Sequence, residues 1–512
     1  MGAEFEDGRR RFAPRATAGA VRQFRLWLVV CVVVGTVAFL ARLLPVLRSG
    51  GLFSISQYDA AVYFGAAVGL VHGELPYRDF LLLHPPGSTL ALAPFAALGY
   101  VVGDSAAWAI ARVAMMALGA FTAVLVARVL WPVGALPALL GGMFYAVHLP
   151  AVTIEVTTRL EPLASACLLG ALVLLGSDTP RTALRPWPVA LAGALLGFAT
   201  TVKIWGLVPL LVVALYLAVG VGVRQAGRFA GGAAVAAVAV CLPFFLAAPA
   251  QMWRQVVSNQ FGRPRSEGFP WERLADMSGL GAGHRLLGEY QTSVNVAASV
   301  VIVVVAVLAS RVIRARLAVV LLAAFAALLT STPTWFPHYA GIWAGVLAVT
   351  LGAAASVPLR SAGHRRFGRR LVVAGVGAVL LAGAALQLTQ VEFGERFPSE
   401  RMAAAVSAVP GCITADDPGA LLQMNVLGRN LRRSCPLVLD LGGYSYDFRP
   451  QRTRSRDPRW QRFFLDHMAS GTVTIKTRYH TGFGLSRASA REFRRWPVFV
   501  EHEGFQLRQP RR

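Results

Sequence analysis

The sequence predicts an α-helical membrane protein that crosses the bilayer about eleven times and ends in a small α/β domain. Three observations carry this prediction. Of the 512 residues, 55% are hydrophobic and 15% are charged, whereas a soluble domain has about 25% charged residues. The mean hydropathy is +0.54. The apolar residues gather in long runs up to about residue 388, and the residues after that are polar enough to be soluble.

The apolar runs set the number of spans. A helix needs about 20 mostly apolar residues to cross the hydrocarbon core. Runs that reach or approach this length predict spans at 26–47, 107–130, 133–149, 162–176, 188–202, 204–222, 229–248, 295–310, 317–332, 341–358 and 371–388. Segment 88–102 is also apolar, but Pro94 interrupts it. We therefore expect a re-entrant or interfacial helix there.

The distribution of arginine predicts the orientation in a plasma membrane. Short loops rich in Lys and Arg stay in the cytoplasm. With residues 1–25 as a cytoplasmic tail, alternating spans bring the compact Arg clusters to the cytoplasmic side: 181 and 185; 224 and 228; 311, 314 and 316; and 360, 365, 366, 369 and 370. The loops 48–106, 150–161, 249–294 and 333–340 and the domain 389–512 then lie outside the cytoplasm. Residues 26–388 form the transmembrane domain.

The C-terminal domain shows alternating strand and helix patterns. The segments GCITADDPG and CPLVLDLGG predict strands, and ALLQMNVLGRN predicts a helix between them. DPRWQRFFLDHMASG predicts an amphipathic helix that begins at Asp-Pro, and TVTIKTRYH and VFVEHEGFQLR predict two more strands. Cys412 and Cys435 are candidates for a disulfide, because an external domain is in an oxidising environment. No Cys/His metal spacing and no GxGxxG pattern occur.

The first external loop concentrates polar residues between apolar runs. Residues 56–72 predict a helix along the membrane surface, which Gly73 is placed to end. Asp59 and Tyr63 are four residues apart and therefore share one face of that helix. The segment His84-Pro-Pro-Gly turns the chain, and Ser88 can cap the next helix. A charged group near lipid is costly and therefore calls for a functional reason.

Each polar candidate could also have a purely structural role. Asp59 could cap its helix, and Arg78 and Asp79 could form a local ion pair. His84 could be an ordinary turn residue, and Lys203 could extend its amine to the lipid headgroups. Arg159 and Glu161 could pair with each other, and His338 could simply lie at the membrane interface.

The first external loop resembles that of the GT-C superfamily of integral-membrane glycosyltransferases, which use polyprenyl-phosphate sugars. The resemblance rests on Gln57-Tyr58-Asp59, on Tyr63, and on GELPYRDF followed by HPPG and an apolar segment that ends in APF. TRLEP and TVKIWG also look like segments of these enzymes. The order of the C-terminal elements resembles envelope mannosyl- and arabinosyltransferases of actinobacteria. The many-span architecture also fits the group that holds protein O-mannosyltransferases and aminoarabinose transferases.

The resemblance implies a reaction and a set of site residues. Asp59 would be the general base that takes the proton of an acceptor hydroxyl. External cations would stabilise the leaving lipid phosphate, and the candidates are Lys203, Arg159, Arg254, Arg263 and Arg265. The supporting candidates are Tyr63, Arg78, Asp79, His84, Glu161 and His338. The loop has no paired-acid D-x-D, so we expect neither a metal nor another cofactor, although Asp59 and Asp79 could still converge on a divalent ion.

The expected partners are a polyprenyl-phosphate sugar, membrane lipids, and an acceptor that is a lipid-linked glycan, a polysaccharide or a protein. Mannose is favoured over arabinofuranose as the sugar. Nucleic acid is excluded, because most arginines lie in short loops between apolar runs. A transporter or lipid flippase with an external domain is the alternative function, although such proteins tend to have internal repeats and none is visible. A non-catalytic scaffold is a third hypothesis.

Overall fold

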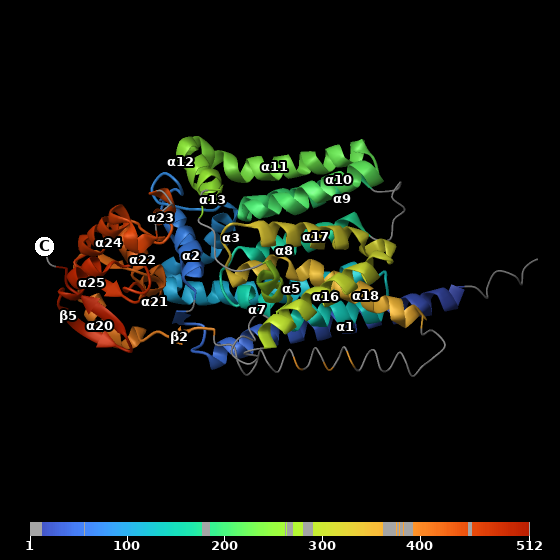
Figure 1. The fold of residues 1–512 in the computed structure, drawn as a ribbon, viewed down its shortest axis with the longest axis horizontal. Coiled ribbons are helices and arrows are strands. Elements are labelled where there is room, and N and C mark those ends of the chain that lie inside the picture. Colours follow the sequence, from blue (N-terminus) through green and yellow to red (C-terminus); the bar gives the residue numbers. More distant parts are fainter. Residues whose placement is uncertain are drawn as a thin grey trace, which may run out of the picture.

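The computed structural model describes residues 13–55, 57–176, 185–261, 263, 270–279, 290–361, 375, 378, 382, 393–448 and 453–510. Its long helices lie side by side with roughly parallel axes, and the residues after 392 gather at one end of this bundle (Figure 1). Apart from residues 375, 378 and 382, the predicted span 371–388 lies outside the described residues, and so does Arg265.

Helices occupy the other ten predicted spans. They are α1 (Ala13–Arg48), α5 (Asp104–Leu130), α6 (Ala135–Val147), α8 (Glu161–Leu175), α9 (Pro186–Val202), α10 (Leu207–Gly220), α11 (Val223–Ala247), α16 (Gln291–Ser310), α17 (Arg316–Ser331) and α18 (Ala344–Ser361). Small residues allow close approach: a Cβ on Gly193 of α9 would lie 1.9 Å from the Phe229 carbonyl oxygen of α11. Such small-residue contacts are typical of helix packing in membranes.

Length and composition support fewer spans than eleven. Within the described residues, five helices are long and apolar enough to cross a membrane, in α1, α5, α11, α16 and residues 313–331. The count becomes six if α6 and α7 (Leu149–Glu155), which meet at a bend of 57°, form one broken span. The remaining apolar helices have 10–17 residues. The structure is thus a helical membrane protein, and eleven spans stays a prediction.

Short helices cover one end of the bundle. They include α2 (Tyr58–Val71), α3 (Gly87–Ala97), α4 (Gly99–Val102), α12 (Pro249–Trp253), the π-helical turn η3 (Arg254–Ser258), α13 (Asn259–Phe261), α14 (Pro270–Ser278) and the 3-10 helices η2 (Ile204–Gly206) and η7 (Pro337–Ile342). The predicted surface helix is α2, and Gly73 follows it with a φ of 94°. The predicted interfacial segment forms α3 and α4.

The C-terminal region contains a four-stranded sheet in the order β3-β4-β6-β5. Its strands are β3 (Ile413–Ala415), β4 (Val473–Lys476), β5 (Val498–His502) and β6 (Phe505–Arg508), and only the β3–β4 pair is parallel. Its helices include α20 (Ser399–Ser407), α21 (Pro418–Gln423), α22 (Leu427–Arg432), α23 (Tyr444–Asp447), η8 (Arg454–Arg456), α24 (Pro458–Ser470) and α25 (Arg487–Arg494). Asp457 caps α24 by accepting from the Arg459 backbone amide, at the predicted Asp-Pro start.

The predicted strand CPLVLDLGG is wrong. Residues 435–440 are not part of a sheet, because their apolar side chains pack on α2 instead. A Cβ on Gly65 of α2 would lie 2.8 Å from Leu439, and one on Gly69 would lie 2.9 Å from Leu437. The Leu439 carbonyl accepts from the Tyr58 hydroxyl instead of from a neighbouring strand.

The C-terminal region and the first external loop share one hydrophobic core, which includes α2, α21 and α22. Polar contacts fix the same interface. The Asp104 carboxylate accepts from the Gly428 backbone amide at 2.8 Å, and the Ser105 hydroxyl donates to Gln423 at 2.7 Å. The short strands β1 (Ser54–Ile55) and β2 (Glu395–Arg396) pair antiparallel beside it. The C-terminal region is therefore held directly over α2.

Candidate functional site

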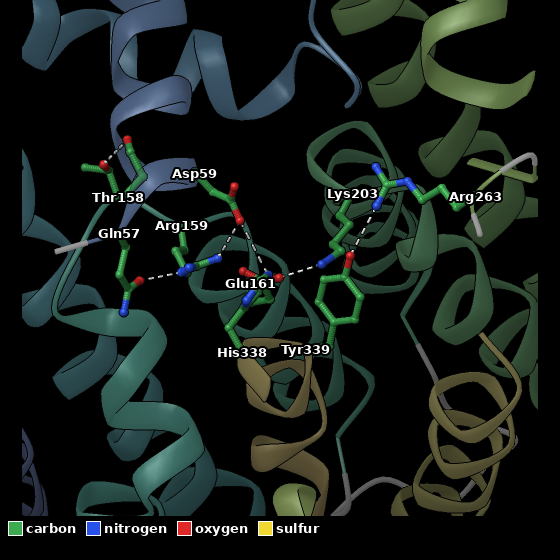
Figure 2. A network of polar contacts seen from close by, with 10 residues as sticks. Gln57, Asp59, Thr158, Arg159, Glu161, Lys203, Arg263, His338 and Tyr339 are labelled. Carbon is green, nitrogen blue, oxygen red and sulfur yellow. Dashed lines mark hydrogen bonds and ion pairs between the residues drawn. The ribbon is translucent and has the colours of Figure 1, made fainter. Parts of the chain in front are cut away.

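Asp59 lies in the first turn of α2, where its carboxylate faces the bundle (Figure 2). Arg159 Nη1 is 3.2 Å from Asp59 Oδ2, and His338 Nε2 is 3.8 Å from the same oxygen. The side chain of Asp59 is 39% exposed, whereas those of Arg159 and His338 are 8% and 12% exposed. Asp59 therefore presents an accessible carboxylate above more deeply buried basic groups.

The segment between α7 and α8, residues 156–160, positions Arg159. The Thr158 hydroxyl donates to the Ala60 carbonyl of α2 at 2.9 Å and accepts from the Trp108 indole at 3.0 Å. Arg159 then donates from Nε to the Gln57 side chain and from Nη1 to Asp59. The segment is thus tied to α2 on both sides of the Arg159–Asp59 pair.

Lys203 joins the cluster from the break between α9 and η2. Its amine forms a buried ion pair with Glu161, the first residue of α8. The same amine lies 4.2 Å from the ring centroids of both Trp205 and Tyr339. Cation–π contacts of this kind help to hold a desolvated amine. Lys203 is therefore inside the protein, and extension to the headgroups is ruled out.

Arg263 extends the basic cluster through Tyr339. Its Nη1 donates to the Tyr339 hydroxyl at 3.2 Å, and its guanidinium lies 5.0 Å from the Tyr446 ring centroid. Burial lowers the pKa of His338 and of His84, and the neighbouring cations Arg263 and Lys203 lower both further. Both histidines are therefore neutral near pH 7 and can donate or accept one hydrogen bond each.

The cluster carries an excess of positive charge. Arg159, Lys203 and Arg263 contribute three cations, and Asp59 and Glu161 contribute two carboxylates. Arginine presents a planar fork that suits phosphate oxygens. The site can therefore accept an anion beside an accessible carboxylate.

Comparisons with known proteins identify the architecture. The model of glycosyltransferase family 87 matches residues 82–332, just under half of the chain. ArnT from Cupriavidus metallidurans, solved with undecaprenyl phosphate, superposes with a TM-score of 0.58 at 15% identity, over 94% of this chain and 97% of ArnT. The chain therefore has the GT-C fold of the membrane glycosyltransferase ArnT, and residues 82–332 are similar to glycosyltransferase family 87. Among curated protein sequences, none matches it.

A second GT-C structure agrees with this fold. The oligosaccharyltransferase of Archaeoglobus fulgidus superposes with a TM-score of 0.56 at 11% identity, over 87% of this chain and 67% of that protein. The family-87 match begins after Asp59 and ends before His338, but it includes Arg159, Lys203 and Arg263. The three cations of the site thus lie inside the segment that matches family 87.

The remaining candidates lie around the cluster or outside it. Tyr63 is buried in α2, with its ring edge-on to His84 at 5.5 Å. Arg78 and Asp79 pair with one another at 2.8 Å in an exposed turn, which is the local ion pair that their adjacent positions allowed. Arg254 pairs with Asp447 of the C-terminal region at 3.0 Å. A pair between Arg159 and Glu161 does not form, since each has another partner.

In the described part of the chain, no group of three or more His, Cys, Asp or Glu side chains is placed to hold a metal ion. Cys412 and Cys435 are joined by a disulfide. The bridge connects the residue before β3 to the loop that follows α22.

One buried charge pair near the site in sequence was not among the predicted site residues. Arg42 of α1 pairs with Glu155, the last residue of α7, and both side chains are fully buried. The Tyr145 hydroxyl donates to the other oxygen of Glu155 at 2.6 Å. An arginine inside a predicted span was the available signal. The pair fixes the chain just before Thr158 and Arg159.

Proposed function

We propose that this GT-C protein transfers a sugar from a polyprenyl-phosphate donor to an acceptor hydroxyl on the extracytoplasmic face of the plasma membrane. The observation that carries the proposal is the accessible carboxylate of Asp59 beside the cations Arg159, Lys203 and Arg263. The undecaprenyl phosphate in the ArnT structure supports a lipid phosphate as ligand. The placement of arginine-rich loops supports the orientation, with a cytoplasmic N-terminus and an external C-terminal region.

The proposed step breaks the bond between the sugar C1 and the phosphate oxygen and forms a bond from C1 to the acceptor oxygen. Asp59 takes the proton of the acceptor hydroxyl as general base. The phosphate leaves with the electron pair of the broken bond. A phosphate diester has one negative charge and the released monoester has close to two, so the added charge develops beside the cationic cluster.

The basic residues have distinct roles in this proposal. Arg159 orients Asp59 and is shared between the base and the donor phosphate. Lys203 and Arg263 hold the phosphate, with Glu161 as the counter-charge that keeps the Lys203 amine in the interior. The neutral His84 and His338 can donate hydrogen bonds to phosphate or sugar oxygens without adding charge.

The sugar and the acceptor are finer parts of the proposal. We favour mannose as the sugar, with arabinofuranose as the second choice, and a lipid-linked glycan, polysaccharide or protein as the acceptor. The test incubates the purified chain in nanodiscs with radiolabelled decaprenyl-phosphate mannose or decaprenyl-phosphate arabinofuranose and an envelope-lipid extract. One label should move to an acceptor. No transfer from either donor, with movement of labelled lipid between leaflets instead, would favour a flippase.

A further inference from the structure

The segment Leu439–Asp447 covers the first turn of α2 next to Asp59. The Tyr58 hydroxyl donates to the Leu439 carbonyl at 3.4 Å and accepts from the Gly442 backbone amide at 3.2 Å. At the other end of the segment, Asp447 pairs with Arg254 of η3 and lies 3.3 Å from the Asn259 amide. The C-terminal region therefore contacts the first turn of α2 at one end of this segment and η3 and α13 at the other.

Three polar side chains lie close to Gly442 in this segment. A Cβ atom built on Gly442 would lie 3.2 Å from the Tyr479 hydroxyl, 3.4 Å from Asp440 Oδ1 and 3.6 Å from Arg454 Cζ. Asp440 is half-buried, and its Oδ1 accepts from the Gly443 backbone amide at 2.7 Å. A glycine here leaves the carboxylate and the guanidinium close to one another without a side chain between them.

An aromatic ring and a second arginine complete the group. The Phe483 side chain is 38% exposed. The guanidinium of Arg478 lies 4.8 Å from the Phe483 ring centroid and 4.7 Å from that of Tyr58, and Arg454 lies 5.8 Å from Phe483. The group thus borders α2 through Tyr58, the residue before Asp59.

The buried carboxylate of Asp416 fixes the loop that carries Arg478 and Tyr479. It accepts from the backbone amides of Thr477, Arg478 and Tyr479 at 2.7, 2.8 and 2.9 Å. These charge-assisted bonds hold the backbone in one conformation. The arginine and the aromatic residues are therefore pre-positioned.

We propose that Asp440, Arg454, Arg478 and Phe483 form a subsite for the carbohydrate part of the acceptor. Sugar hydroxyls both donate and accept hydrogen bonds, which suits the Asp440 carboxylate with the Arg454 guanidinium near it and the Arg478 guanidinium next to Phe483. The apolar face of a sugar ring packs on an exposed aromatic ring, and a few polar groups then fix its orientation. Burial raises the pKa of Asp440, and the negative charge of Asp59 raises it further. This agrees with the two carboxylates lying near one another.

This inference deepens the proposed function and rests on it for the role of the bound sugar as acceptor. The geometry gives the acceptor a fixed position beside the base, since Tyr58 links the subsite to the first turn of α2. A glycan held at Phe483 would lie next to Arg478, whose guanidinium also lies 4.7 Å from the ring centroid of Tyr58, the neighbour of Asp59 in sequence. The inference accordingly favours a glycan over a peptide as the acceptor.

The test measures glycan binding to the full chain in nanodiscs, with no donor present. An α-1,6-linked mannotriose and an arabinofuranose trisaccharide are each titrated by calorimetry. We expect one of them to bind the wild type, and Phe483→Ala and Asp440→Asn to raise its Kd at least fivefold. Phe499→Ala is the matched control, because Phe499 is 48% exposed on β5, and it should leave the Kd unchanged.

The outcomes separate this inference from the proposed function. Asp440→Asn keeps the Oδ1 acceptor of the Gly443 amide, so it decides the question even if Phe483→Ala fails to fold. The subsite is refuted if neither trisaccharide binds the wild type, or if Asp440→Asn binds as tightly as the wild type. Intact glycan binding without any sugar transfer would refute the proposed function and leave the subsite standing.

Discussion

Replacing Asp59 with asparagine removes the proposed base with little change in shape. Asparagine keeps a side-chain oxygen that can accept from Arg159 Nη1, now 3.2 Å from Asp59 Oδ2. Arg159 also keeps its bond from Nε to the Gln57 side chain. Since the Asp59 side chain is 39% exposed, solvent screens the lost charge. We expect the free energy of unfolding to change by less than about 1 kcal/mol.

The effect on the chemical step should be far larger. A general base contributes about 10²–10⁴-fold to the rate, which corresponds to roughly 3–5 kcal/mol in the activation free energy. Asparagine cannot take the proton of the acceptor hydroxyl, while the cations that hold the donor phosphate stay in place. We therefore expect kcat for sugar transfer to fall about 10²–10⁴-fold, with a small change in the KM of the donor.

The assay compares Asp59→Asn with Asp79→Asn under saturating donor. Asp79 is the matched control, because it lies in the same segment between α1 and α5 and forms an exposed ion pair with Arg78. Asp79→Asn should transfer sugar at close to the wild-type rate. Wild-type kcat in Asp59→Asn, or an equal loss in both variants, would refute the assignment of Asp59 as the base.

Three further predictions concern stability. Lys203→Met should lower the thermal midpoint of unfolding sharply, because a buried Glu161 without its partner costs about 3–5 kcal/mol. Adding Glu161→Gln should restore the midpoint but not sugar transfer. Restored transfer in the double variant would contradict a phosphate-binding role for Lys203. The Cys412–Cys435 bridge closes a sequence separation of 23 residues and should contribute about 3 kcal/mol, so a reductant should lower the midpoint of the wild type and not that of a double Ser variant. Burial raises the pKa of Asp417 to about 6, so the folded state favours the protonated form and loses stability as the pH rises from about 4 to about 6. Asp417→Asn should therefore be more stable than the wild type at pH 7, by up to about 3 kcal/mol. This difference in the free energy of unfolding should disappear at pH 4.

Local sequence patterns predicted many of the elements. Apolar runs located helices such as α5 and α11, and the Asp-Pro start located α24, since burial in lipid and helix capping depend on neighbouring residues along the chain. The same reasoning failed for residues 435–440, whose apolar pattern is that of a strand. Their apolar side chains pack on α2, a contact more than 350 positions away in sequence that local pattern cannot reveal.

The candidate site was predictable as a set of residue types but not as an arrangement. The first loop stood out because a charge near lipid needs a reason, and the resemblance to GT-C enzymes then implied Asp59, Arg159 and Lys203 as site residues. Only the fold showed that Arg159 pairs with Asp59 and that Lys203 pairs with Glu161. It also showed that Asp79 pairs with its neighbour Arg78 and not with the site. These partners of the site come from separate segments of the chain, and their pairing depends on how the helices that flank those segments pack.

By itself, the sequence determined that this is a helical membrane protein with a polar C-terminal region and several acidic residues in the segment after the first apolar run. Hydrophobic burial and charge avoidance act over one span at a time, so these properties can be read along the chain. The tertiary structure decided which charges share a site. It brought Arg159, Lys203 and Arg263 beside Asp59 and set Leu439 and Gly442 against Tyr58 at the start of α2, because close packing and the need to pair buried charges act between segments far apart in sequence.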